Sequence, residues 1–99
     1  MSQLNYRVVD GHFHLTGELS FASVAHSDAL IRECEAASQQ ITIDMAEVEH
    51  ADSAATALMV ELHRRVNSAG GQLNFINIPE HLFAVLEMTN LDQLLPINR

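Results

Sequence analysis

Hydrophobic and polar residues alternate along the first part of the chain with the two-residue period of a β-strand. Residues 4–9 and 12–19 flank Asp10-Gly11, a dipeptide that readily takes the positive φ angles of a tight hairpin turn. In the second segment, Phe13 and Leu15 point to one face and the polar residues between them point to the other. The pattern predicts an antiparallel hairpin with one apolar face.

Three later segments have apolar residues at the spacings of three and four that are typical of amphipathic helices. The first spans residues 23 to about 38, and its stripe consists of Val24, Leu30, Ile31, Cys34 and Ala37. The second spans residues 54–69, and its stripe consists of Ala55, Leu58, Met59, Leu62 and Val66. Gly70-Gly71 ends this helix, and Pro79 opens the third. The stripe of the third helix consists of Leu82, Val85 and Leu86.

Short segments rich in β-branched or apolar residues separate these helices. Residues 40–44 and 73–78 are typical of strands within a sheet, and residues 91–97 are apolar enough to pack on the body of the protein. A hairpin followed by helix, strand, helix, strand and helix predicts an α/β fold. We therefore expect a single domain over residues 1–99, with a mixed sheet of about four strands and helices mainly on one face.

The net charge of the chain indicates which kinds of partner it can bind. Five basic against thirteen acidic residues give a net charge of −8, which argues against binding to nucleic acid or directly to anionic lipid. The same charge suits a protein with a basic docking patch. The single cysteine cannot form an intramolecular disulfide, and no run approaches eighteen apolar residues. We expect a cytoplasmic protein without direct membrane insertion, which a partner could still hold at a membrane.

Ser53 is the first candidate for chemistry, because His50 and Asp52 are close in sequence. Neighbouring residues on one turn seldom align as nucleophile, base and orienting acid, and the chain has no Gly-x-Ser-x-Gly motif. We expect no catalytic residue here. Asp52 or Ser53 should instead cap the second helix, which stabilises it by about 1 kcal/mol. Ser53 or Thr56 could also serve as a docking or phosphorylation point.

Metal and thiol chemistry have weaker support. His12 and His14 share one face of the predicted strand and could chelate a metal, but the sequence identifies no third ligand, and half-exposed strand histidines are the commoner case. Cys34 falls on the apolar stripe of the first helix, which predicts a buried, inert thiol. Met45, Met59 and Met88 are expected to fill the core. The sequence therefore predicts no metal and no cofactor.

Four segments occur in an order and spacing that are characteristic when taken together. They are Leu-Thr-Gly-Glu-Leu at 15–19, Ile-Thr-Ile-Asp-Met-Ala-Glu-Val at 41–48 leading into Asp52-Ser53, the Gly-Gly pair at 70–71, and Leu-Asp-Gln-Leu-Leu-Pro-Ile at 91–97. The chain resembles the STAS domain family, which includes anti-sigma factor antagonists and the small cytoplasmic subunit of Mla-type phospholipid ABC transporters. The resemblance covers nearly the whole chain and implies the α/β STAS fold.

In that family the Ser or Thr directly after the Asp, here Ser53, starts the second helix and lies on the partner-binding surface. In the antagonists it is the residue that a partner kinase phosphorylates. Those antagonists usually continue with Ser-Gly-Leu-Gly, whereas this chain has Ala-Ala-Thr-Ala at 54–57. The Leu-Thr-Gly-Glu-Leu strand and the Leu-Leu-Pro ending look closer to the transporter subunit.

The resemblance therefore implies a non-catalytic accessory subunit that binds the cytoplasmic ATPase of the transporter and supports its assembly and activity. The implied contact residues are Asp52, Ser53, Thr56 and two positions expected to be exposed on the second helix, Glu61 and Arg65. The alternative is an anti-sigma factor antagonist that binds an anti-sigma factor kinase and is switched by phosphorylation at Ser53.

Overall fold

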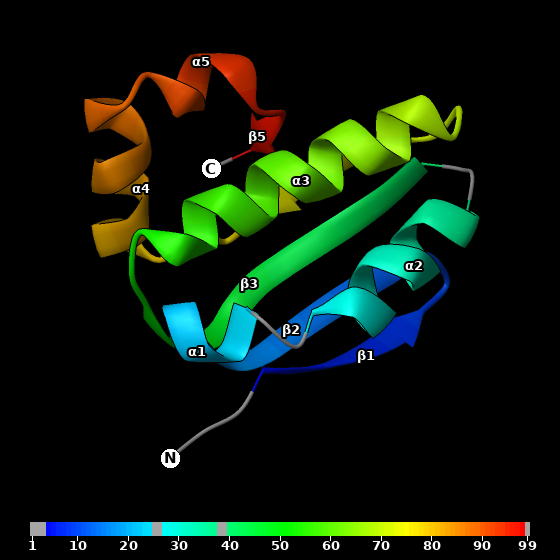
Figure 1. Ribbon diagram of the computed structural model, residues 1–99, viewed down its shortest axis with the longest axis horizontal. Coiled ribbons are helices and arrows are strands. Elements are labelled where there is room, and N and C mark those ends of the chain that lie inside the picture. The colour runs from blue at the N-terminus through cyan, green and yellow to red at the C-terminus, as the bar shows by residue number, and fades with distance from the viewer. Residues whose placement is uncertain (1–3, 25–26, 38–39, 99) are drawn as a thin grey trace.

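The computed structural model describes residues 4–24, 27–37 and 40–98, which form one sheet covered by helices (Figure 1). The described strands are β1 (Asn5–Val9), β2 (His12–Leu19), β3 (Gln40–Ala51), β4 (Gln72–Ile76) and β5 (Ile97–Asn98). They lie in this order across the sheet. β1 is antiparallel to β2, and the other neighbouring pairs are parallel. The mixed α/β sheet is confirmed, with five strands where about four were expected.

The N-terminal hairpin follows the predicted pattern closely. Asp10 and Gly11 both have positive φ angles, 50° and 76°, as a two-residue turn matched to the twist of the strands requires. Along β2, Phe13, Leu15 and Leu19 are buried, and the residues between them on the other face are only partly buried. One side of the hairpin therefore forms part of the core.

The helices are α1 (Phe21–Val24), α2 (Asp28–Ala37), α3 (Ala54–Ser68), α4 (Glu80–Met88) and α5 (Leu91–Leu94). The single helix expected over residues 23–38 is wrong, because the described part of that segment contains two helices. The N–H and the hydroxyl of Ser27 both donate to the carbonyl of Val24, at 3.2 and 2.7 Å. The carbonyl of Ser27 then accepts from the N–H of Ile31 at 3.0 Å and starts α2.

α3 is the central helix and lies across the sheet beside α2 (Figure 1). The five residues of its predicted stripe are all buried, as are Leu30, Ile31 and Cys34 of α2. At its end Gly70 has a φ of 89°, and the N–H of Gly71 donates to the carbonyl of Val66 at 2.9 Å. This is the glycine-terminated helix end that the sequence predicts.

The C-terminal segment packs back on the body, as expected, and adds an unforeseen strand. The N–H of Phe75 in β4 donates to the carbonyl of Pro96 at 2.9 Å, and Phe75 pairs with Ile97 of β5. Leu82 and Leu86 of α4 are buried, whereas Met88 is 82% exposed and is not the core filler that was expected. Among the described residues, no helix is both long and apolar enough to cross a membrane.

The bounds of two strands differ from those expected. β3 continues to Ala51 rather than ending near residue 44, and its register with β2 shifts along the way. β4 ends at Ile76 because the next residue, Asn77, has a φ of 55° and leaves the extended conformation. Both differences lie near polar residues on the face of the sheet that α3 does not cover.

Candidate functional site

The loop that carries Asp52 and Ser53 lies where two parallel strands end. β3 ends at Ala51, and the N–H of Asp52 donates to the carbonyl of Leu19, the last residue of β2, at 3.1 Å. α3 then begins at Ala54. The carboxyl ends of parallel strands are where ligands and partners commonly bind in open α/β sheets. Hydrogen bonding to the end of β2 therefore holds this loop in a fixed position.

The carboxylate of Asp52 joins the starts of two helices. Its Oδ1 accepts from the N–H of Ala54 at 2.8 Å, and its Oδ2 accepts from the N–H of Phe21, the first residue of α1, at 3.2 Å. A negative charge is favourable at these ends because their N–H groups point outward unpaired. Of the two residues expected to cap α3, Asp52 is the one whose side chain does so.

Ser53 and Thr56 present their hydroxyl groups differently. Ser53 already has helical angles, φ −62° and ψ −19°, and its exposed side chain makes no capping hydrogen bond. Thr56 donates its hydroxyl to the carbonyl of Ser53 at 2.6 Å and is only partly exposed. Ser53 is therefore the better placed of the two hydroxyls to meet a partner or a kinase.

Glu61 and Arg65 lie further along α3 and face α2. Two guanidinium nitrogens of Arg65 donate to the two carboxylate oxygens of Glu35 at 2.9 and 3.2 Å, and a third donates to Glu61 at 3.3 Å. Arg64 also binds Glu61, at 2.7 and 3.1 Å. These hydrogen bonds hold the pKa values of Glu35 and Glu61 below their ordinary values.

The residues expected to contact a partner therefore lie in two separate places: Asp52, Ser53 and Thr56 at the start of α3, and Glu61 and Arg65 further along it. At 1.5 Å rise per residue, Glu61 and Arg65 lie about 12 and 18 Å along the helix axis from Ser53. Both are only partly exposed, contrary to the exposed positions expected, and their charges are paired within the chain. They connect α2 to α3 and do not meet Ser53.

Sequence reasoning missed the exposed side of α3 and the residue beside it. Along α3 the residues at spacings of four and three from Ser53 are all exposed: Ala57, Val60, Arg64 and Asn67. This spacing, opposite the buried stripe, was the available signal. Phe21 of α1, which packs against α3, is 84% exposed. We call Phe21, Ser53, Ala57 and Val60 the α1–α3 surface.

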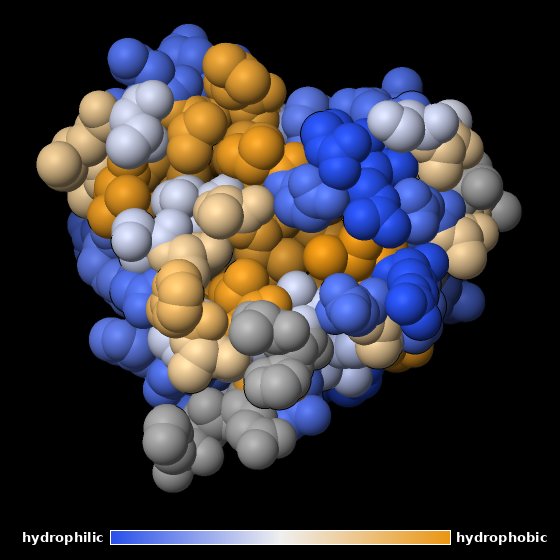
Figure 2. All heavy atoms as spheres, in the orientation of Figure 1, coloured by the Kyte–Doolittle hydropathy of each residue, from blue (hydrophilic) through white to orange (hydrophobic). Residues whose placement is uncertain are grey.

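The surroundings of the α1–α3 surface are apolar at one end and charged at the other. Figure 2, which views the helix-covered side, shows apolar residues gathered on the side where α1, α4 and α5 lie. Hydrophilic residues cover the part where α2 and α3 run together. The α1–α3 surface thus adjoins the less charged part of this side.

Nucleophilic chemistry has little support in this geometry. In the described residues, no hydrogen bond or ion pair joins Ser53 to His50 or to another base. Cys34 is fully buried, and burial together with the nearby charge of Glu33 raises the pKa of its thiol to about 12. A thiol with so high a pKa carries almost no thiolate at neutral pH, which is the inert group that the sequence predicts.

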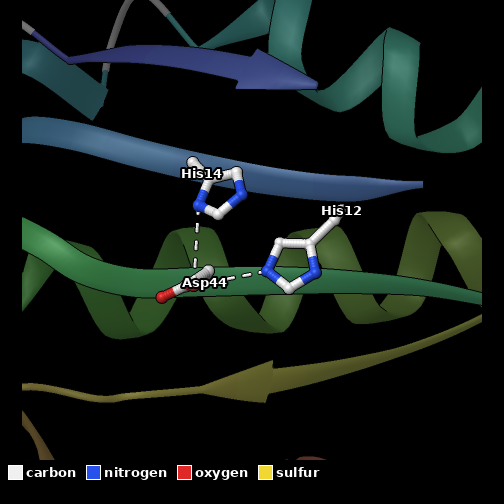
Figure 3. A group of neighbouring side chains, drawn as sticks. All are labelled: His12, His14 and Asp44. Carbon is white, nitrogen blue, oxygen red and sulfur yellow. Dashed lines mark hydrogen bonds and ion pairs between the residues drawn. The ribbon is translucent and has the colours of Figure 1, made fainter. Parts of the chain in front are cut away.

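A second polar group lies elsewhere, on β2 and β3. The parallel register places Asp44 opposite His14, and Asp44 Oδ2 lies 3.3 Å from His12 Nε2 and 3.5 Å from His14 Nδ1 (Figure 3). Burial alone would raise the pKa of Asp44, but hydrogen bonds from Ala46, Asn77 and His12 outweigh it and lower the pKa. Asp44 is a third side chain of a metal-ligating type beside His12 and His14, which the sequence could not identify.

Comparison with known families agrees with this architecture. The model of the STAS domain matches residues 3–99 of the chain. The chain belongs to the STAS domain family. This match confirms the family inferred from the Asp52-Ser53 loop and the segments around it. The comparison with curated proteins gave no significant match.

Solved structures share the fold of this STAS domain at low sequence identity. A Thermotoga maritima protein assigned as an anti-sigma factor antagonist is 23% identical with a TM-score of 0.76, and the match covers 95% of this chain and 84% of that one. An anti-sigma factor antagonist from Mycobacterium paratuberculosis is 17% identical with a TM-score of 0.77, over 98% and 85% of the two chains. The Bacillus cell fate determinant SpoIIAA in its phosphorylated form is 17% identical with a TM-score of 0.65, over 100% and 92%. These likenesses show the fold.

Proposed function

We propose that this STAS domain is a non-catalytic accessory subunit that binds the cytoplasmic ATPase of an Mla-type phospholipid ABC transporter and supports assembly and activity of that complex. The observation that carries the proposal is the position of Phe21, 84% exposed beside the start of α3. Its backbone N–H is fixed by Asp52, so the ring extends from a rigid base. A preorganised aromatic side chain is a common anchor in protein interfaces.

The rest of the α1–α3 surface suits a protein partner. Ser53 and Ala57 are small, which allows another chain to approach α3 closely, and Val60 adds apolar area that is 37% exposed. Asp52 holds this surface in place, and Thr56 borders it. Further along the helix, the ion pair of Arg65 with Glu35 connects α3 to α2, and Glu61 pairs with Arg65.

Charge supports the choice of partner and location. The net charge of −8 favours a partner with a basic docking patch and disfavours anionic lipid. In this proposal the domain is a cytoplasmic protein held at the inner face of the inner membrane by the ATPase alone. No chemistry is required of it, since its part is to stabilise the assembled complex.

Co-purification with the ATPase subunit encoded in the same genome tests the proposal. Ser53→Arg places a long charged side chain in the centre of the α1–α3 surface and is expected to weaken binding at least tenfold. Ser68→Arg is the matched control, because it makes the same change at an exposed position at the other end of α3. Undiminished binding of Ser53→Arg, with a circular dichroism spectrum equal to that of the wild type, would contradict the proposed surface.

A second candidate function, an anti-sigma factor antagonist that binds a kinase-type anti-sigma factor, is favoured by one observation. The side chain of Ser53 is exposed and makes no capping hydrogen bond, so a kinase could reach it. Incubation with such a kinase and ATP should then add one phosphate, which is lost in Ser53→Ala and retained in Thr56→Ala. Absence of labelling would contradict this candidate and leave the ATPase proposal standing.

A further inference from the structure

The face of the sheet turned away from the core carries a group of metal-binding side chains. Ile43 and Met45 of β3 are fully buried, so Asp44 between them points to the opposite face. His12 and His14 of β2 point to that same face, because Phe13 between them is buried in the core. The ligand atoms of the two histidines and Asp44 lie within 4.8 Å of one another.

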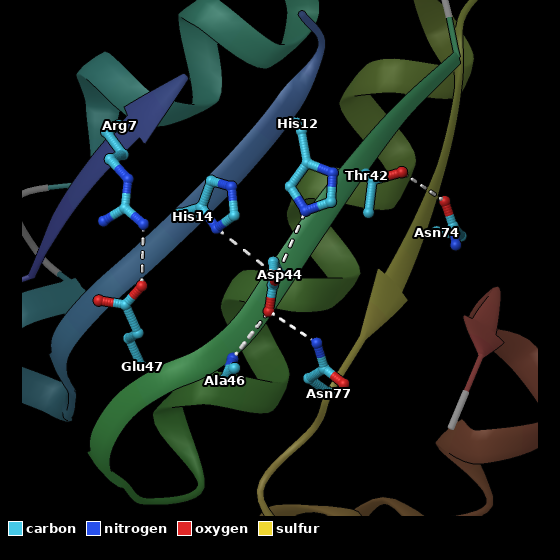
Figure 4. A network of polar contacts seen from close by, with 9 residues as sticks. All are labelled: Arg7, His12, His14, Thr42, Asp44, Ala46, Glu47, Asn74 and Asn77. Atoms are coloured by element: carbon cyan, nitrogen blue, oxygen red, sulfur yellow. Dashed lines mark hydrogen bonds and ion pairs between the residues drawn. The ribbon is translucent and has the colours of Figure 1, made fainter. Parts of the chain in front are cut away.

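The carboxylate of Asp44 is held in a fixed orientation by its neighbours (Figure 4). Its Oδ1 accepts from the N–H of Ala46 at 3.0 Å and from the side-chain amide of Asn77 at 3.1 Å. The other oxygen, Oδ2, is the one that faces His12 and His14. Outer hydrogen bonds of this kind orient the ligands in metal sites.

Both hydrogen bonds to Oδ1 depend on departures from regular strand structure. The register of β3 against β2 shifts just after Asp44, since His14 pairs with Asp44 but Thr16 pairs with Glu47. This irregularity turns the N–H of Ala46 toward the Asp44 side chain. Bulges are over-represented beside functional sites, where they redirect particular groups. Asn77, at the end of β4, reaches Asp44 from a positive φ of 55°.

We propose that His12 Nε2, His14 Nδ1 and Asp44 Oδ2 bind a divalent transition metal ion of the zinc type, with a fourth position open to water. Tetrahedral zinc with bonds of about 2.0–2.1 Å requires ligand atoms about 3.3 Å apart. The two distances from Asp44 Oδ2, 3.3 and 3.5 Å, already match this separation. The two imidazole nitrogens lie within 4.8 Å of each other and would move closer together to complete it.

Exposure and donor chemistry favour the same ion class. Asp44 is the most buried of the three, with 12% side-chain exposure, while His12 and His14 are 36% and 25% exposed and leave a path from solvent. Imidazole nitrogen suits zinc, copper, nickel and cobalt, whereas magnesium and calcium prefer oxygen ligands. The net charge of −8 adds a general attraction for cations. A bound ion would connect β2 directly to β3.

Titration of the untagged, metal-free protein with Zn²⁺ and with Co²⁺ tests the proposal. Calorimetry should show one saturable site, the Co²⁺ complex should show the visible absorption of tetrahedral coordination, and Mg²⁺ should not compete for the site.

The variants Asp44→Asn and His14→Gln should each abolish the cobalt absorption spectrum. Asn77→Ala, which removes an outer hydrogen bond, should weaken binding about 10–100-fold. His81→Gln, at an exposed position on α4, is the matched control and should bind as the wild type does.

An NMR readout uses the wild-type chain alone. Added Zn²⁺ should shift the imidazole NMR signals of His12 and His14 and leave those of His63 and His81 in place. In a separate thermal-denaturation experiment, Zn²⁺ should raise the thermal midpoint of the wild type but not that of His14→Gln. Absence of saturable binding at 1:1 stoichiometry, or equal binding by wild type, Asp44→Asn and His14→Gln, would overturn the proposal.

Discussion

Asp52 connects the starts of the two helices that carry the α1–α3 surface. Its carboxylate accepts one hydrogen bond from the start of α3 and one from the start of α1. The sequence predicted a cap at this loop but could not choose between Asp52 and Ser53, because both are favoured capping residues. The choice depends on α1, whose first N–H reaches Asp52 across the ends of β2 and β3.

Replacing Asp52 should therefore cost stability, whereas replacing Ser53 should not. Asp52→Ala removes the acceptor for two helix-start N–H groups and is expected to lower the free energy of unfolding by about 1–2 kcal/mol. Ser53→Ala should stay within about 0.5 kcal/mol of the wild type, since no capping hydrogen bond is lost. Urea denaturation measures both values. Equal destabilisation by the two variants would contradict the assignment of the cap.

At the scale of elements, local patterns predicted the helices and strands better than they predicted where each one ends. The stripe of α3 and the hairpin turn were correct because a single period or dipeptide determines each. The break between α1 and α2 was missed, since periodicity does not reveal the hydrogen bonds of Ser27 with Val24. β5 was missed because two residues, Ile97-Asn98, carry too little pattern to predict a strand.

The candidate site shows the same division between local and distant information. Ser53 could be predicted, since a helix start is encoded nearby in the sequence. Phe21 and Asp44 could not, because each reaches its place through a neighbour more than thirty positions away, by way of strand pairing that the sequence leaves open. Arg65 was predicted as exposed because its partner Glu35 lies on another helix.

At the scale of the whole molecule, burial of Cys34 makes the free energy of unfolding depend on pH in the alkaline range. Its pKa is raised in the folded chain from 9.0 to about 12, so the folded state holds the proton more tightly than the unfolded state does. The resulting stability is fully present below about pH 9 and is lost as the pH rises toward 12. The five basic residues of this sequence are all arginines, so no lysine titrates in this range.

Denaturation of the wild type and of Cys34→Ala between pH 7 and 11 measures this contribution. The variant should be less stable at pH 7 because of the lost buried sulfur. The difference in the free energy of unfolding between the wild type and Cys34→Ala should shrink above pH 9, by up to about 1.4 kcal/mol per pH unit. Tyr6, whose pKa is also raised, chiefly by burial and by Glu33, titrates in both chains, so most of its contribution cancels, and only the smaller part due to the charge of Cys34 differs between them. A difference that stays constant over the whole range would contradict the prediction.

The most direct test of the docking proposal compares two exposed apolar side chains of similar exposure. Phe21 lies on the α1–α3 surface and is 84% exposed, while Met88 lies at the end of α4 and is 82% exposed. The measurement is the Kd for the transporter ATPase of the wild type, Phe21→Ala and Met88→Ala. We predict that Phe21→Ala binds at least about 30-fold more weakly, a loss of about 2 kcal/mol, and that Met88→Ala binds as the wild type does. Wild-type affinity in Phe21→Ala, or a loss confined to Met88→Ala, would contradict the account.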